Sequence, residues 1–285
     1  MPTINAGGVD LFYTESGSGQ PVLFVHGIPT DYRAWNRQVQ KLSKNHRVVA
    51  VSRRYAAPNA RSGDMLDSTV GNNAADMKAL VEKLGLAPVH LVGHSYGGFI
   101  SAFLAADHPD LVRSLVLVEP AVSTMLVADQ NSPVQLLALL LRSPTVALSA
   151  RKFQSRALNP SLRALAAGQT DRAAELMVDG VQDSPGAFGR LNSEARQMML
   201  QNGRTVGELR TRFPQFGRAE ASRIACKTLV VNGESSPLWL RRIGQLLSAA
   251  IPKCSYARIP GSAHFPHMDN PAGFNGKLLE FLSAA

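Results

Sequence analysis

Short apolar runs alternate with helical patterns along most of this chain. Each run is rich in valine, leucine and other strand formers, and is bounded by glycine, proline or polar residues. Between the runs, apolar residues recur at helical spacing, most clearly in 74–85 and in the last dozen residues. This alternation predicts a parallel sheet with crossover helices. The candidate strands are 9–16, 22–27, 47–52, 89–94, 113–118, 227–232 and 255–260.

The alternation stops after Pro120 and resumes at Lys227. Residues 122–222 show no convincing strand pattern, and their apolar clusters, separated by proline and glycine, predict several helices. A helical insertion between two core strands accounts for this change. We therefore expect a core formed by 1–121 and 223–285, with 122–222 as a helical cap.

Composition and charge narrow the classes of partner. The chain has 285 residues, of which 45% are hydrophobic and 18% charged, as in an ordinary globular protein. Its net charge is +9, but the 30 lysines and arginines are scattered and never exceed two in succession. Nucleic-acid binding would need a basic stripe with interleaved aromatic residues, so we expect no nucleic-acid partner.

The sequence also bears on the cellular compartment. The N-terminus enters strand-like sequence directly, without the pattern of a signal peptide. The most apolar segment, 133–150, is interrupted by Gln135 and Arg142 and falls short of the ~18 apolar residues of a membrane span. Cys226 and Cys254 are expected to be free thiols. We expect a cytoplasmic monomer or homodimer with no membrane partner.

Residues 89–99, VHLVGHSYGGF, carry the clearest chemical signal. Gly93-His94-Ser95-Tyr96-Gly97 follows an apolar strand and precedes a helical pattern, which is the setting of a nucleophile elbow with Ser95 at the apex. A serine hydroxyl needs a base to take its proton. His264 is the candidate, because it follows the last core strand, at the carboxyl edge where parallel sheets form their sites. His267, three residues later, is its competitor.

These motifs together resemble the α/β-hydrolase superfamily. The resemblance rests on GHSYGG around Ser95, GSAHFPH around His264, and His26-Gly27-Ile28-Pro29, which is similar to the HGxP signature of epoxide hydrolases and haloalkane dehalogenases. It implies a doubly wound, mostly parallel eight-stranded α/β sheet with an inserted helical cap. It also implies an oxyanion hole formed by the backbone N–H groups of Ile28 and Tyr96.

The orienting acid of the base is not at its usual place. Most members of the superfamily have an aspartate after the strand corresponding to 227–232, where this chain has Ser236. Glu119 ends the strand that follows Ser95 by one helix, so its carboxylate is expected to reach the same imidazole. This position resembles that of one branch of haloalkane dehalogenases and of zearalenone lactonases. Glu234 is the alternative acid.

The nucleophile indicates the chemistry. A serine with an oxyanion hole suits acyl transfer, so we expect a serine hydrolase that cleaves a small to medium apolar ester or lactone through an acyl-enzyme. No cofactor or metal is required. A C–C bond hydrolase, a ligand receptor on the same scaffold and a cofactor-free haloperoxidase are the alternatives. Phe265, Trp35 and Met199 are candidate pocket residues, and Arg53 and Arg54 are interpreted as structural.

Overall fold

A single eight-stranded sheet forms the centre of the molecule, described here from a computed structural model that covers residues 2–59, 65–129 and 132–285. The strands are β1 (Thr3–Ala6), β2 (Val9–Ser16), β3 (Gln20–Val25), β4 (His46–Val51), β5 (Val89–His94), β6 (Val112–Val118), β7 (Lys227–Gly233) and β8 (Cys254–Ile259), in the spatial order β1-β2-β4-β3-β5-β6-β7-β8. The pairs β1–β2 and β2–β4 are antiparallel, and the other five pairs are parallel. The predicted fold class is confirmed.

The strand β1 is the element that the apolar pattern missed. It is four residues long and pairs with β2 through a tight turn at Gly7 and Gly8, both of which have positive φ. Its sequence, TINA, offers too few apolar positions to show the alternation of a longer strand. The hairpin turn, rather than the strand itself, carries the sequence signal.

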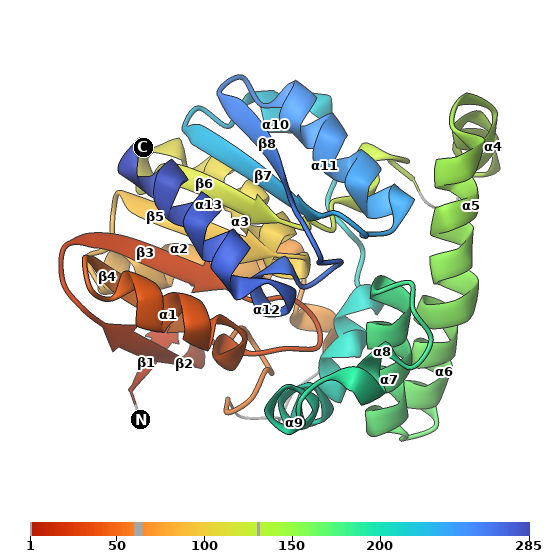
Figure 1. Cartoon of the computed structure of the whole chain (residues 1–285), viewed down its shortest axis with the longest axis horizontal. Coiled ribbons are helices and arrows are strands. Elements are labelled where there is room, and N and C mark those ends of the chain that lie inside the picture. The colour runs from red at the N-terminus through yellow and green to blue at the C-terminus, as the bar shows by residue number, and fades with distance from the viewer. Residues whose placement is uncertain (1, 60–64, 130–131) are drawn as a thin grey trace.

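Helices cover both faces of the sheet because successive strand side chains point to opposite sides. In β3, Val22 and Phe24 join the core cluster beneath α1 (Asn36–Leu42) and α13 (Pro271–Ser283). Leu23 and Val25 join the cluster beneath α2 (Val70–Lys83), α3 (Tyr96–Asp107) and α11 (Leu238–Ala250). Figure 1 shows α1 and α13 in front of the strands. This two-sided burial explains why the central strands are almost entirely apolar.

A helical insertion follows β6 and lies at one side of the sheet, at the right of Figure 1. Its described residues contain helices and turns but no strand. The main helices are α4 (Pro133–Arg142), α5 (Pro144–Phe153), α6 (Asn159–Ala166), α7 (Thr170–Val181), α8 (Ala187–Arg190) and α9 (Ser193–Gln201). A π-helical segment, Gln154–Leu158, joins α5 to α6, and η6 (Gly203–Arg210) and α10 (Arg218–Ser222) lead back to β7.

Polar side chains bind the insertion to the core. Asn202 donates from Nδ2 to Asp31 Oδ2 at 2.7 Å and accepts from the backbone N–H of Ala57 at 2.8 Å. Nearby, Arg33 Nη2 donates to Gln201 Oε1 at 2.6 Å. Because Asn202 uses both ends of its amide in buried bonds, it fixes the position of the cap over the loop that follows β4.

The two arginines after β4 have structural partners. Arg53 Nη1 lies 2.7 Å from Glu208 Oε2 in η6, and both side chains are fully buried. Arg54 forms an ion pair with Asp76 of α2. Arg53 also lies over the ring of Tyr96, 5.0 Å from its centroid. The Arg53–Glu208 pair is therefore a second buried link between core and cap.

Within the described part of the chain, no helix is both long enough and apolar enough to cross a bilayer.

Candidate active site

The register of the sheet brings two candidate residues, Ser95 and Glu119, into one row. His94 pairs with Val118, and Val118 pairs with Val231. The residues that follow them, Ser95, Glu119 and Asn232, therefore lie side by side at the carboxyl edge. Backbone bonds hold this row, from Ser95 N–H to Val118 O at 2.9 Å and from Glu119 N–H to Val231 O at 2.8 Å. A site at this edge agrees with the general rule for parallel sheets.

Ser95 occupies a strained turn between β5 and α3. Its φ of 52° and ψ of −117° are unusual for a residue with a side chain. A Cβ on Gly93 would collide with Ser101 Oγ and Gly97 O, and one on Gly97 would collide with the backbone of β3. The glycines on either side of Ser95 thus allow the tight packing that holds its hydroxyl at the apex.

His264 lies between Ser95 and Glu119. Its loop connects β8 to α12 (Pro266–Asp269), and its Nε2 is 3.1 Å from Ser95 Oγ. On the other side of the ring, Nδ1 is 3.3 Å from Glu119 Oε2. Ser95 is 8% exposed, His264 1% and Glu119 0%. This arrangement of a serine hydroxyl, an imidazole and a buried carboxylate is consistent with a catalytic triad.

The carboxylate of Glu119 is held by the strand end next to it. Its Oε1 accepts three hydrogen bonds, from Asn232 Nδ2 at 2.8 Å, Gly233 N–H at 2.6 Å and Ser236 Oγ at 2.6 Å. Oε2 is left to face His264. Glu119 itself has a φ of 48°, so its backbone is also in the left-handed region. Ser236, at the usual position of the acid, serves here as a donor to Glu119.

A comparison with known families agrees with this geometry. Residues 20–271 match the sequence model of the alpha/beta hydrolase fold. The chain belongs to the α/β-hydrolase fold family. The match spans strands β3 to β8 and the inserted helices, and leaves out β1, β2 and nearly all of α13.

Similar proteins within the family differ in their named activities. The RutD protein of Azorhizobium caulinodans, named as a candidate carbamate hydrolase, is 25% identical over 99% of this chain and 98% of its own length. A non-heme haloperoxidase of Rhodococcus erythropolis is 35% identical, over 47% of this chain and 48% of its own. A bromoperoxidase structure from Bacillus anthracis has a TM-score of 0.73 at 20% identity, covering 96% of both chains.

The loop that carries His264 in this α/β hydrolase is fixed through its backbone. His94 Nε2 lies 2.8 Å from the carbonyl oxygen of His264, and the backbone N–H of His264 donates to Gln182 Oε1 in the cap at 2.9 Å. Burial and the neighbouring histidines His267 and His264 lower the pKa of His94 well below its ordinary value, so its ring is neutral. A neutral His94 therefore donates its Nε2 proton to this carbonyl, a role that its place in the elbow motif did not reveal.

The loop after β3 approaches the nucleophile closely. A Cβ on Gly27 would lie 2.8 Å from the Cβ of Ser95, so the backbone of Gly27 lies against Ser95. Ile28 is the next residue of this loop. His26 fixes this loop, because its Nδ1–H donates to Gly27 O at 2.8 Å while Nε2 accepts the backbone N–H of Arg53 at 3.0 Å. Tyr96 begins α3. The expected oxyanion donors, the N–H groups of Ile28 and Tyr96, thus belong to segments that adjoin Ser95.

Glu234 lies apart from this group. It is exposed, and its carboxylate accepts the backbone N–H of Gly261 at 3.3 Å. His267, the competing base, is fully buried and stacks on Trp35 with ring centroids 4.3 Å apart. Burial, followed by the charge of His264, lowers the pKa of His267 to about 3. The geometry therefore does not bring Glu234 or His267 to Ser95.

The three candidate pocket residues are all fully buried. Trp35 packs against Phe24 in the cluster beneath α1 and α13, and so forms part of the hydrophobic core. Phe265 lies beside His264, with ring centroids 5.2 Å apart, and Met199 belongs to the larger core cluster. Of these residues, Phe265 is the one whose ring contacts the candidate base.

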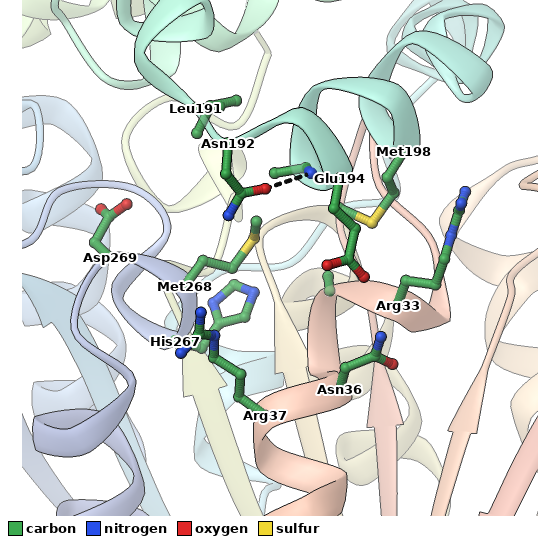
Figure 2. A pocket seen from close by; sticks show the side chains of 12 residues that line it. Arg33, Asn36, Arg37, Leu191, Asn192, Glu194, Met198, His267, Met268 and Asp269 are labelled. Carbon is green, nitrogen blue, oxygen red and sulfur yellow. Dashed lines mark hydrogen bonds between the residues drawn. The ribbon is translucent and has the colours of Figure 1, made fainter.

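A cavity of about 150 Å³ lies at the seam between core and cap (Figure 2). The cap contributes Asn192, Glu194 and Met198, and the core contributes Arg33, Arg37 and His267, among others. A second cavity, of about 380 Å³, is lined partly by Gln182 and by Ser262 and Ala263, which precede His264 in its loop. Among the described residues, no group of three or more His, Cys, Asp or Glu side chains could hold a metal ion.

Proposed function

We propose that this protein hydrolyses a small to medium apolar carboxylic ester or lactone through an acyl-enzyme on Ser95. One observation carries the proposal. The imidazole of His264 lies within hydrogen-bonding distance of Ser95 Oγ on one side and of the Glu119 carboxylate on the other. A base in this position, oriented by a carboxylate, activates a hydroxyl for attack on a carbonyl carbon.

The proposed reaction uses each of these groups in turn. His264 Nε2 takes the proton of Ser95 as Oγ attacks the carbonyl, and Glu119 stabilises the imidazolium that forms. The backbone N–H groups of Ile28 and Tyr96 bind the developing oxyanion. His264 then gives its proton to the leaving alcohol, and it later activates the water that releases the acid from Ser95.

Solved structures with the same fold support a substrate class of this kind. They include an esterase from Thermogutta terrifontis (TM-score 0.70, 21% identity) and Est816, described as an N-acyl homoserine lactone degrading enzyme (TM-score 0.64, 21% identity). An enol-lactonase from Burkholderia xenovorans is also similar (TM-score 0.66, 19% identity). At these identities they support the scaffold for ester or lactone cleavage without selecting a substrate.

Covalent labelling combined with a substrate panel tests the proposal. A fluorophosphonate probe should label wild-type protein at Ser95, and Ser95→Ala should abolish labelling. Chromogenic esters and lactones of graded chain length should then show steady-state turnover that disappears in the same variant. Labelling without turnover on this panel would refute the ester or lactone assignment and favour a C–C bond hydrolase or a receptor. Halogenation that depends on peroxide would favour the haloperoxidase alternative.

A further inference from the structure

The helix α4 presents its apolar side chains to solvent instead of to the core. Five residues have large exposed fractions, namely Val134 (78%), Leu141 (76%), Leu137 (56%), Leu140 (43%) and Leu136 (42%). None of the ten residues of α4 is buried. A helix face rich in leucine normally packs against a neighbouring element, whereas these leucines are exposed to solvent.

The exposed residues form one continuous surface. At 100° per residue, the five side chains fall within an arc of roughly 160°, with Gln135 and Arg142 on the other side of the helix. The helix packs on α5 at the outer margin of the cap, away from the sheet (Figure 1). Leu148 of α5 is a further exposed leucine, at 59%. We call these six apolar residues the α4–α5 apolar face.

The segment of sequence that carries this face is basic. Between Asp129 and Asp171 the sequence contains no acidic residue, but it contains five basic ones, Arg142, Arg151, Lys152, Arg156 and Arg163, each of them exposed. Arg151 and Lys152 follow Leu148 by three and four residues, so they lie beside it on the surface of α5. Lys152 also pairs with Asp183 at 2.5 Å.

We propose that the α4–α5 apolar face docks onto the surface of an anionic lipid bilayer. Exposed leucines with Arg151 and Lys152 beside them match an interface in which apolar side chains enter the acyl boundary and basic side chains meet lipid phosphates. A ten-residue helix is about 15 Å long, half the thickness of the hydrocarbon core, so α4 lies along the interface and does not span it. The sequence-based expectation of no membrane partner rested on the lack of a span, which surface docking does not need.

A second copy of the chain fits this face less well. A twofold interface brings the same patch of each copy together. Arg151 of each copy would then approach a surface of its own sign, because residues 130–170 supply no acidic side chain to pair with it. An anionic surface instead satisfies both the apolar and the basic side chains.

Vesicle co-sedimentation of the full chain tests the proposal. Vesicles of phosphatidylcholine, alone or with about one third phosphatidylglycerol, are compared at low salt and at about 1 M salt, where charges are screened beyond about 3 Å. Leu137→Glu/Leu141→Glu should abolish binding, whereas Leu238→Glu, at an exposed leucine of α11, should not. Arg151→Gln/Lys152→Gln, which removes the two cations beside Leu148, should weaken binding to anionic vesicles roughly thirtyfold, because each cation near the surface contributes about 1 kcal/mol.

A matched charge control separates local docking from the effect of net charge. Arg212→Gln/Arg218→Gln removes the same two charges from exposed positions outside the acid-free segment and should change binding less than threefold. Equal losses in the Arg151/Lys152 and Arg212/Arg218 variants, or no binding of wild type to anionic vesicles, would overturn the proposal. So would sedimentation equilibrium showing a dimer that Leu137→Glu/Leu141→Glu dissociates, since a second copy would then cover the face.

Discussion

Replacing Glu119 by glutamine should disable the nucleophile by changing the tautomer of His264. Three donors converge on Glu119 Oε1, from Asn232, Gly233 and Ser236. In Glu119→Gln the amide oxygen must occupy that position, because the amide N–H₂ group there would face N–H donors and leave them unpaired, at about 1–3 kcal/mol each. The N–H₂ group is then directed at His264 Nδ1.

An amide donor at Nδ1 favours the tautomer of His264 that carries its proton on Nε2. That proton points at Ser95 Oγ, 3.1 Å away, so the ring cannot take the serine proton. The variant also loses the negative charge that stabilises the imidazolium. Together these effects should slow acylation about 10⁴-fold, or about 5.4 kcal/mol in the activation free energy.

The rate of fluorophosphonate labelling measures this loss without knowledge of the substrate. Glu234→Gln is the matched control, since it makes the same chemical change at an exposed glutamate and should leave the labelling rate within threefold of wild type. Thermal unfolding should show both variants folded. A labelling rate for Glu119→Gln within tenfold of wild type would refute the tautomer argument. A large loss in Glu234→Gln alone would move the acid to the turn after β7.

Three further outcomes follow from buried groups. Ser236→Ala removes one donor to Glu119 and should lower the free energy of unfolding by about 1–3 kcal/mol, with about a tenfold slower labelling rate. Glu208→Gln leaves the Arg53 charge unpaired and should cost about 3–5 kcal/mol in urea unfolding, whereas Arg53→Met/Glu208→Leu should cost less than Glu208→Gln alone. The pKa of His267 is about 3 in the folded protein and 6.5 in the unfolded chain. Below pH 6.5 the unfolded chain therefore binds a proton that the folded protein does not, and the free energy of unfolding decreases as pH falls. Relative to His267→Phe, wild type should lose about 2 kcal/mol between pH 7.5 and pH 5 in urea unfolding.

The parts of the structure that depend on local pattern could be predicted from the sequence. The strand before Ser95, the glycines around it and the helix after it together predict a turn, because only that combination leaves room for it. The position of Glu119 followed from one strand–helix–strand step, since neighbouring parallel strands end at the same edge. Both inferences use spacings that the backbone itself fixes.

Contacts between distant segments gave no sequence signal. Nothing in the turn after β7 shows that Ser236 donates to a carboxylate 117 residues earlier, or that Gln182 of the cap accepts from His264. Trp35 was a candidate for the pocket without a positional argument, and it packs in the core beneath α1 and α13. Periodicity also could not predict that the α4 leucines are exposed. It identifies an apolar helix face but not the element that packs against it.

The carboxylate of Glu119 is held by groups from two neighbouring strands. Glu119 follows β6, yet every donor to its Oε1 belongs to β7 or to the turn that follows it. The pairing of Val118 with Val231 brings these groups together, and their hydrogen bonds offset the unfavourable φ of Glu119. An aspartate in place of Ser236 would put a second negative charge where a donor now stands, 2.6 Å from the carboxylate. The neutral donor Ser236 at the usual acid position and the carboxylate of Glu119 after β6 therefore depend on each other.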